Sequence, residues 1–303
     1  MTDGETLTPA EAFAAVSNET RLAILGALAE AHRDMSFSEL RAAVGMADSA
    51  QFNYHLKQLQ PQFVLKTEDG YRLRYAGTQV VRAIVVGTFT ADRTRGPFDV
   101  RGECVSCGEG LCATYDDEML TVECSSCKRL HSKMAFPSSG LRDRNDGELL
   151  DAYDRWVRAE YGLVANGVCA DCGGPMDAEL VAPEAVYGYA CASAEAAGFE
   201  VGVNHHCEQC DAHVGAAVGM GLLYEDEVVA FHADHGVDVE EVRYWELPWT
   251  VSDRYTTVES RDPWCIVVAI PLDDELLRVT LGGSLGVETV ERVGRGSEAT
   301  AEA

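Results

Sequence analysis

The sequence is poor in lysine, has no long apolar run and carries no basic segment at its N-terminus. Four lysines and 20 arginines stand against 50 acidic residues, so the formal net charge is −26. Without such an apolar run, and without a basic segment followed by an apolar one, neither a membrane-spanning helix nor a secretory signal is expected. We therefore expect a cytoplasmic protein with no membrane partner. Because 47% of the residues are apolar, the acidic surface is expected to cover folded domains adapted to concentrated salt.

Signatures of catalysis are absent as well. The sequence contains no H-E-x-x-H motif, no glycine-rich phosphate loop and no evident pairing of a nucleophile with a base. We therefore expect that the protein is not an enzyme.

Cysteine, in contrast, is abundant and mostly paired. Eight of the 11 cysteines form four C-x-x-C pairs, which are Cys104/Cys107, Cys124/Cys127, Cys169/Cys172 and Cys207/Cys210. A disulfide framework does not suit a reducing compartment, whereas four cysteine thiolates make a closed tetrahedral zinc site. The sixteen residues between the first two pairs are typical of a zinc ribbon. Thioredoxin-like redox chemistry is the alternative.

The other two pairs are separated by thirty-four residues, a weaker spacing, and Cys191, His205, His206 and His213 offer competing ligands. We assign a second metal site to the four cysteines, so the chain is predicted to hold two structural zinc ions. Cys112 and Cys265 are expected to be buried small side chains. A redox role for Cys112, Cys191 or Cys265 stays open.

Charge divides the chain unevenly. Residues 1–95 carry 11 acidic and 10 basic groups, a net charge of −1, whereas the remaining 208 residues carry 39 and 14, a net charge of −25. A segment that lacks the strong negative charge of the rest of the chain suits binding to a polyanionic partner. The alternative is a small helical domain that simply has few surface acids.

The first ninety residues contain clear helix-starting signals. Thr8 and Ser36 each open a capping box, and Asn18 and Asp48 can cap two further helices, the last running to about Leu59. The segments 63–67 and 71–75 are β-prone and are joined through Asp69-Gly70, which predicts a hairpin. A final apolar helix is expected from about Gln79 to Phe89.

This order of elements is that of a winged helix-turn-helix, and the sequence resembles a known family. The stretches "SNETRLAILGALAE", "FSELRAAVG" and "SAQFNYHLKQL" are similar to ArsR-type winged helix regulators in a version found among haloarchaeal proteins. The later stretches "ELLDAYDRWVR", "VVAFHADHGVDV" and "SRDPW" resemble the C-terminal region of that group. The resemblance implies double-stranded DNA as a partner and a homodimer. Metal-sensing members carry Cys-x-Cys before the recognition helix, but this chain has Ser38-Glu39-Leu40-Arg41 there, so no metal sensing is expected at that position.

The expected recognition helix has distinct inner and outer faces. At 100° per residue, Phe52, Leu56 and Leu59 point toward the core, and the polar residues point outward. Glutamine, asparagine and lysine can contact base edges, and tyrosine can meet a thymine methyl group. A merely solvated polar surface is the alternative, and His55 could equally pack at the helix edge. The candidate DNA contacts are Ser49, Gln51, Asn53, Tyr54, His55, Lys57 and Gln58 on the helix and Lys66, Arg72 and Arg74 on the hairpin.

Apolar residues also follow a stripe along the final helix of this segment, at Val80, Val81, Ile84, Val85 and Phe89. They could form a dimer interface, as in the resembled family, or cover the domain's own core, or do both.

The rest of the chain shows weaker patterns. An amphipathic helix is expected from about Asn145 to Tyr161, after a linker at 137–140, and another helix over 228–235. His232 and His235 lie one turn apart on the latter and could bind metal as a pair. No third ligand is evident, so a surface or packing role is favoured. Strands are expected near 242–251, 255–260, 264–270, 276–281 and 286–292.

We therefore predict a multidomain α+β fold. The winged helix-turn-helix spans 1–95, a first zinc ribbon 96–137, and a linker and amphipathic helix 138–167. A second zinc-ribbon-containing α+β domain with a small β-rich end spans 168–293, and a disordered tail spans 294–303.

The predicted function is that of a DNA-binding transcriptional regulator whose zinc-ribbon region serves dimerisation, partner contact or effector sensing. With its net charge of −25, that region would itself repel phosphate. Two alternatives remain. A winged helix followed by a zinc ribbon also describes a basal component of the transcription machinery, and the chain could be a zinc-dependent protein-interaction or stress-sensing adaptor.

Overall fold

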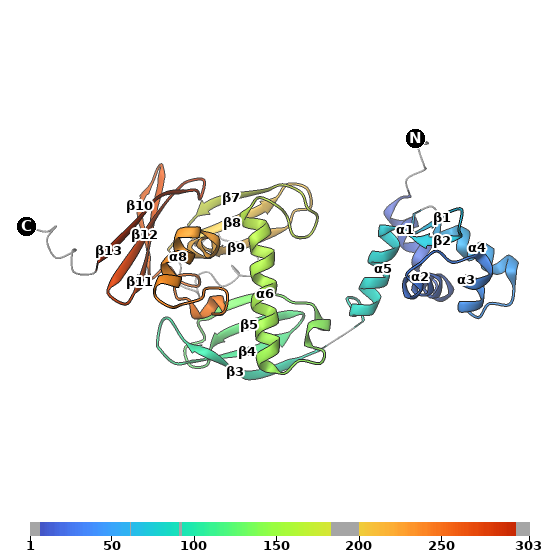
Figure 1. Ribbon diagram of the computed structural model, residues 1–303, viewed down its shortest axis with the longest axis horizontal. Helices are drawn as coiled ribbons and strands as arrows, with labels where there is room; N and C mark the ends of the chain where they lie inside the picture. The colour runs from blue at the N-terminus through green and yellow to red at the C-terminus, as the bar shows by residue number, and fades with distance from the viewer. Residues whose placement is uncertain (1–6, 61, 91–92, 183–199, 295–303) are drawn as a thin grey trace, which may run out of the picture. The chain divides into compact units, whose positions relative to one another are not determined.

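The computed structural model describes residues 7–60, 62–90, 93–182 and 200–294 (Figure 1). Cys191 and residues 295–303 of the expected tail lie outside the described residues. The chain divides into two compact units, 1–91 and 92–303. Helices and antiparallel sheets occur together, which confirms the mixed α+β class. In the described ranges, no helix is both long enough and apolar enough to cross a bilayer.

The first unit consists of short helices and one hairpin. Its elements are α1 (Pro9–Val16), α2 (Glu19–Ala31), α3 (Phe37–Ala43), α4 (Ser49–Leu59), β1 (Val64–Lys66), β2 (Tyr71–Leu73) and α5 (Tyr75–Val86). The expected caps are confirmed: Thr8, Asn18, Ser36 and Asp48 each accept a backbone N–H from the first turn of their helix.

The last helix of this unit begins earlier than expected. The prediction of a start near Gln79 was wrong, because α5 begins at Tyr75. The Arg74 N–H donates to the Phe63 carbonyl and the Thr78 N–H donates to the Arg74 carbonyl, so the chain turns from β2 directly into the helix.

The core of the first unit contains the inner face of α4. Phe52, Leu56 and Leu59 are buried together with α2 residues such as Ile24, as the helical phase predicted. Burying three large side chains on one face fixes the opposite face outward. The turn of the hairpin requires glycine at position 70. Its φ is +143°, and a Cβ there would lie 2.2 Å from the Met35 carbonyl oxygen.

In the described part of the second unit there are three sheets, all antiparallel. The first, in the order β3-β4-β5-β6, consists of β3 (Arg95–Glu103), β4 (Gly110–Asp116), β5 (Met119–Cys124) and β6 (Leu130–Ala135). The second consists of β7 (Met176–Val181), β8 (Gly202–Cys207) and β9 (His213–Ala217). The third, in the order β10-β11-β12-β13, consists of β10 (Thr256–Arg261), β11 (Trp264–Leu272), β12 (Glu275–Gly282) and β13 (Val287–Gly294), and it confirms the last four expected strands.

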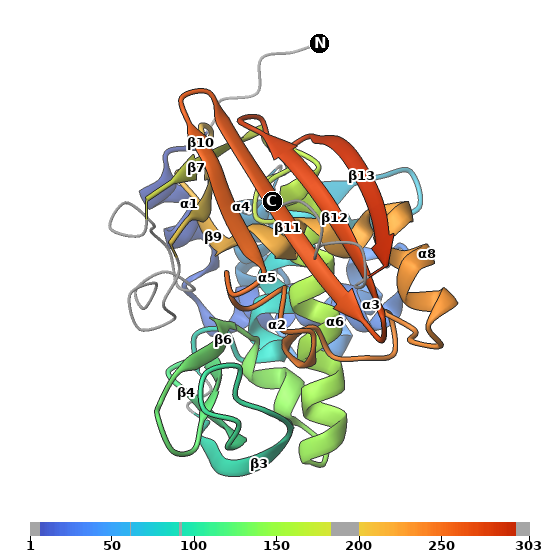
Figure 2. The same cartoon turned by 90° about the vertical axis from the view of Figure 1, so that its left-hand side faces the viewer.

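Helices connect these sheets. The long helix α6 (Asp146–Ala165) is capped by Asn145 and passes the first two sheets, whereas α8 (Asp226–Asp234) lies beside the third sheet in both Figure 1 and Figure 2. The short 3-10 turns of the described residues are η1 (Ser138–Leu141), η3 (Val218–Tyr224) and η4 (Tyr244–Glu246). The expected linker at 137–140 was therefore wrong in part, because it enters η1 with Ser138 buried.

One hydrophobic cluster runs through the second unit. It joins side chains of the first sheet, α6, the second sheet and the third sheet, for example Tyr115, Tyr153, Val203 and Ile266. The residues expected to form the first ribbon, the linker and most of the C-terminal domain therefore share one core, whereas Cys169 and Cys207 lie in a separate small cluster with Val164 and Met176.

The expected strand near 242–251 is absent, because side chains of α6 occupy its backbone groups. Asp154 accepts the Tyr244 N–H at 2.8 Å, and Arg158 donates to the Val242 carbonyl at 2.7 Å. Thr250 Oγ1 then donates to the Tyr244 carbonyl. The segment is an irregular, buried turn fixed by polar contacts, so its apolar residues do not indicate a strand.

Candidate functional site

Two clusters of four cysteines lie in the described part of the second unit, one at an end of the first sheet and one at an end of the second sheet. In the first, Cys104 Sγ lies 3.6 Å from Cys127 Sγ and Cys107 Sγ lies 3.5 Å from Cys124 Sγ. The four Sγ atoms all lie within 4.8 Å of one another. The strands position them, because each C-x-x-C pair follows or precedes a strand end that is held in register by its neighbour.

The second cluster has the same geometry despite its longer spacing. Cys169 Sγ lies 3.6 Å from Cys210 Sγ, and Cys172 Sγ lies 3.5 Å from Cys207 Sγ. The competing ligands His206 and His213 are not part of it. Strand β8 pairs with β7 along its length and brings Cys207 next to Met176, which accounts for a cluster whose two cysteine pairs are far apart in the sequence.

The sulfur positions fit a tetrahedral metal ion. Four sulfurs about 2.3 Å from one ion at tetrahedral angles lie about 3.8 Å apart, close to the distances in both clusters. In each cluster two cysteine residues are buried and two are exposed. The two clusters could therefore hold two metal ions, and the closed set of four ligands leaves no position for catalysis.

Backbone hydrogen bonds favour a thiolate at one buried cysteine of each cluster, whereas sulfur neighbours raise the pKa of Cys107, Cys172 and Cys210. Burial opposes ionisation of Cys124, but backbone N–H groups of Cys127 and Ser126 outweigh it and lower the pKa of this thiol to about 6. The same balance, with backbone N–H groups of Cys210 and Gln209, lowers the pKa of Cys207 to about 7. Thiolates are the form that binds metal.

The remaining described cysteines have no such activation. Cys112 and Cys265 are half-buried, so the expectation of full burial was wrong. Each lies on a strand, with its side chain on the face away from the core. Burial, helped by nearby carboxylates, raises the pKa of both thiols. Neither has the lowered pKa of a reactive cysteine.

The outer face of α4 is exposed where the sequence expected it. Gln51, Tyr54, Lys57 and Gln58 are exposed, with the Tyr54 side chain 59% accessible. Ser49 is exposed as well, whereas Asn53 and His55 are half-buried at the flanks. From Ser49 to Leu59 the helix contains no acidic residue.

The hairpin adds cations to the same unit. Lys66, Arg72 and Arg74 are all exposed, and Glu68 and Asp69 occupy the tip between the strands. Lys66 and Tyr71 are paired across the hairpin, with Arg72 opposite Leu65.

The apolar stripe of α5 divides between two environments. Val80 and Val81 pack against the core of the first unit. Ile84, Val85 and Phe89, at the C-terminal end of the helix and just beyond it, are 48%, 64% and 81% exposed. The stripe therefore covers the core at one end and is open at the other.

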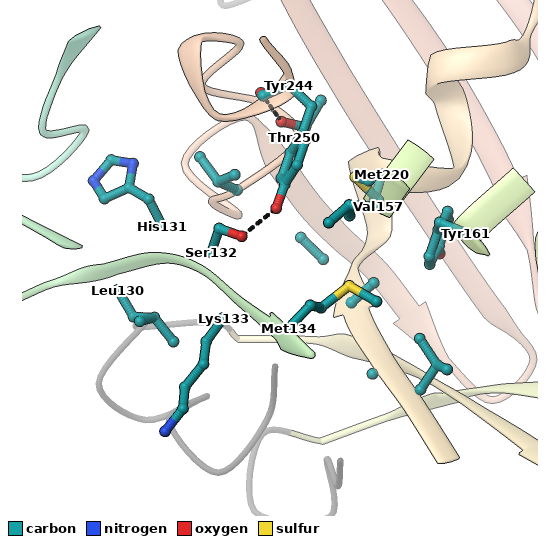
Figure 3. A pocket seen from close by; sticks show the side chains of 15 residues that line it. Leu130, His131, Ser132, Lys133, Met134, Val157, Tyr161, Met220, Tyr244 and Thr250 are labelled. Atoms are coloured by element: carbon teal, nitrogen blue, oxygen red, sulfur yellow. Dashed lines mark hydrogen bonds between the residues drawn. The ribbon is translucent and has the colours of Figure 1, made fainter. Parts of the chain in front are cut away.

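The second unit also contains a mostly apolar pocket of about 590 Å³, its open mouth included, between β6, α6, β9 and the segment after η4. At one side the Tyr244 hydroxyl meets the Ser132 hydroxyl, and Tyr161 lies at the opposite side (Figure 3). The Ser132 hydroxyl continues to Tyr153, whose hydroxyl donates to the Leu120 carbonyl. This chain of hydroxyls ties β5, β6, α6 and η4 together.

The histidines of α8 pack inside the unit, as expected. His232 is buried and its Nδ1 lies 2.7 Å from the Val228 carbonyl, while His235 contacts the Phe231 carbonyl and Glu275. A different polar cluster was missed: His206, Asp211 and His213 lie together beside the second cysteine cluster. The sequence analysis named the two histidines only as competing ligands of the cysteine site, and the signal for a separate cluster was their position on either side of Cys207 and Cys210, with Asp211 between.

Comparisons with known proteins identify families without a described activity. The family model for the domain of unknown function DUF7351 matches residues 101–287, and that for the domain of unknown function DUF7347 matches residues 9–84. No curated protein and no solved structure matches the chain.

Proposed function

We propose that this chain, which belongs to the DUF7351 family, is a transcriptional regulator that binds double-stranded DNA through an ArsR-like winged helix-turn-helix in its first unit. The observation that carries the proposal is the outer face of α4. It is exposed, polar and free of acidic residues in a chain whose formal net charge is −26. A surface kept clear of carboxylates in so acidic a protein suits contact with phosphates.

In this proposal α3 and α4 are the two helices of the helix-turn-helix, and α4 enters the major groove. Gln51 and Gln58 offer amide groups to base edges, Tyr54 offers a ring and a hydroxyl, and Lys57 reaches guanine or phosphate. Burial of Phe52 and Leu56 supports this assignment, since it fixes the phase in which these polar side chains face outward.

The β1–β2 hairpin serves as the wing. Lys66, Arg72 and Arg74 are exposed on it and would contact the phosphate backbone or the minor groove. Such contacts add affinity without sequence preference. Because molar salt shortens the Debye length to about 3 Å, specific binding in concentrated salt would depend mainly on the base contacts of α4.

The second unit would act as a cytoplasmic scaffold with two structural zinc ions in ribbon-like sites. Its sulfur geometry, with four sulfurs gathered at tetrahedral separations, supports zinc over redox chemistry. The common core supports a rigid body that presents one acidic surface to a partner or senses an effector, rather than a string of independent ribbons.

The proposed active form is a homodimer. Exposed apolar side chains at the end of α5, namely Ile84, Val85 and Phe89, support an interface between two copies. A two-fold dimer would place two α4 helices about 34–36 Å apart, one turn of DNA.

The test is binding of purified full-length variants to a selected duplex and to its scrambled counterpart in molar KCl. Tyr54→Ala should weaken specific binding by about 1–3 kcal/mol, the range of a good base contact, and leave scrambled binding nearly unchanged. Lys66→Ala and Arg72→Ala should weaken both duplexes alike. Wild-type protein that does not distinguish the duplexes, or Tyr54→Ala that binds like wild type, would refute the assignment of α4.

A further inference from the structure

The second cysteine cluster has a group of metal-ligating side chains on its outer surface that the cluster itself does not use. His206 precedes Cys207 at the end of β8, Asp211 follows Cys210, and His213 begins β9. His206 and His213 are directly opposite each other in the β8–β9 pairing. The turn between the strands places Asp211 beside both rings.

The three side chains converge on one point. His206 Nε2 lies 3.1 Å and His213 Nε2 lies 3.4 Å from the same Asp211 oxygen, Oδ1. Two ligand atoms about 2.1 Å from one ion lie about 3.0 to 3.4 Å apart at octahedral or tetrahedral angles. The separations of the two nitrogens from Asp211 Oδ1 are in this range. The two imidazole rings are stacked, with centroids 4.7 Å apart and planes 13° from parallel, so binding of one ion requires the rings to turn until both Nε2 lone pairs point at it.

The first cysteine cluster shows what the same positions hold when no such site is present. Glu123 precedes Cys124, Lys128 follows Cys127, and Leu130 is opposite Glu123 across β5 and β6. Lys128 Nζ and Glu123 Oε1 form an ordinary surface ion pair at 3.1 Å. The knuckle fold therefore does not require the two imidazoles and the carboxylate of the second cluster.

The backbone conformation at Asp211 is shared by both clusters and positions the side chain that follows the second cysteine pair. Its φ is +63°, in the left-handed region, where the first pair of each cluster is followed by Gly108 or Gly173. Glycine adopts this conformation at no steric cost. The matched residue of the first cluster, Lys128, has the same φ and uses its side chain to reach Glu123. An aspartate at this position likewise gives up the advantage of glycine and gains a carboxylate aimed at two histidines.

We propose that His206, Asp211 and His213 form a third metal site, which takes a first-row divalent transition ion such as Ni²⁺, Co²⁺ or Zn²⁺. Imidazole nitrogen suits these ions, whereas Mg²⁺ and Ca²⁺ prefer sets of oxygen ligands. The rings are about two-fifths exposed and the carboxylate is 86% exposed. The site is therefore open to solvent, and water completes its coordination. Unlike the closed cysteine sites, it exchanges its ion and has a position for an outside ligand. The proposal does not depend on DNA binding.

The test is a calorimetric Ni²⁺ titration of the full chain with both cysteine clusters loaded with zinc, in molar KCl with excess Mg²⁺ to saturate ordinary carboxylates. Wild-type protein should bind one Ni²⁺ per chain while its zinc content stays unchanged. Since a group that merely orients a ligand is worth about 10- to 100-fold in metal affinity, His206→Asn and His213→Asn should each weaken Ni²⁺ binding at least about tenfold.

Asp211→Gly removes the carboxylate without disturbing the turn, because glycine readily adopts the positive φ that Gly173 has in the same cluster. This variant should keep its zinc and lose Ni²⁺ affinity. Glu123→Gln, at the position of the first cluster that matches His206, should leave the titration unchanged. Absence of stoichiometric Ni²⁺ binding, Ni²⁺ uptake only in exchange for zinc, or binding that survives both histidine substitutions would overturn the proposal.

Discussion

Removal of the buried carboxylate of Asp154 should be among the most damaging single changes in the second unit. Asp154 and Arg158 are 6% and 13% exposed, and Arg158 Nε donates to both carboxylate oxygens at 2.9 and 3.0 Å. Asp154 Oδ1 also accepts the Tyr244 N–H at 2.8 Å. Asp154→Ala leaves a buried guanidinium and a buried N–H without these acceptors.

The magnitude follows from what is left behind. Breaking a buried ion pair by removing one partner costs about 3–5 kcal/mol, because the other charge stays buried. A typical domain unfolds with about 5–15 kcal/mol, so the loss is a large part of the total. The more exposed pair one turn earlier is the control: Asp151 is 51% exposed and contacts Arg243, and Asp151→Ala should cost less than about 1 kcal/mol.

Urea unfolding in constant molar KCl, followed by tryptophan fluorescence, measures the difference. All four tryptophans, Trp156, Trp245, Trp249 and Trp264, lie in the second unit, so the signal reports this unit alone. If the free energies of unfolding of Asp154→Ala and Asp151→Ala differ by less than about 1 kcal/mol, the reasoning is refuted. The ion pair of Asp154 and Arg158 would then not be the contact that fixes the segment around Tyr244.

Three further predictions follow from the same structure. Cys124→Ser should remove one of two bound metal ions and lower the free energy of unfolding by several kcal/mol, whereas Cys112→Ser should keep both ions. Metal analysis of the purified proteins checks this, and equal metal content in the two variants would contradict it. Burial, aided by the nearby Arg129 charge, lowers the pKa of His131 from 6.5 to about 4. Between these two pH values the unfolded chain binds a proton at His131 and the folded chain does not. The stability that is present above pH 6.5 is therefore lost as the pH falls toward 4. His131→Phe should reduce the loss between about pH 7 and pH 5 by up to about 2 kcal/mol, and urea midpoints that shift equally in both proteins would contradict it. Phe52→Ala should destabilise the first unit by about 3–5 kcal/mol, whereas Tyr54→Ala should cost well under about 1 kcal/mol. Thermal melts measure both. A larger loss for Tyr54→Ala would show that the buried and exposed faces of α4 have been assigned the wrong way round.

Local signals predicted the first unit well. Its helix starts depend on capping side chains a few residues away, such as Thr8 with Glu11 and Ser36 with Glu39, and these contacts occur in the structure. The inner face of α4 also followed from the helical repeat alone. The start of α5 was missed because it is set by the Arg74 N–H bond to Phe63, a contact across the hairpin rather than along the helix.

The second unit depends on contacts that local patterns do not contain. The pairing of cysteines was readable, because the ligands come in close pairs, but the strands that bring the pairs together were not. The segment around Tyr244 looked like a strand because its residues are apolar. Its conformation is instead set by Asp154 and Arg158, which lie on α6, far away in the sequence.

The central claim, that the first unit binds specific DNA sites, is tested most directly by genome-wide occupancy of the full-length protein in the cells that encode it. The account predicts a small number of discrete sites with two-fold symmetric sequences, which Tyr54→Ala loses while its protein level stays unchanged. Enrichment at every active promoter would instead indicate a basal component of the transcription machinery. No enrichment at any site would contradict the claim.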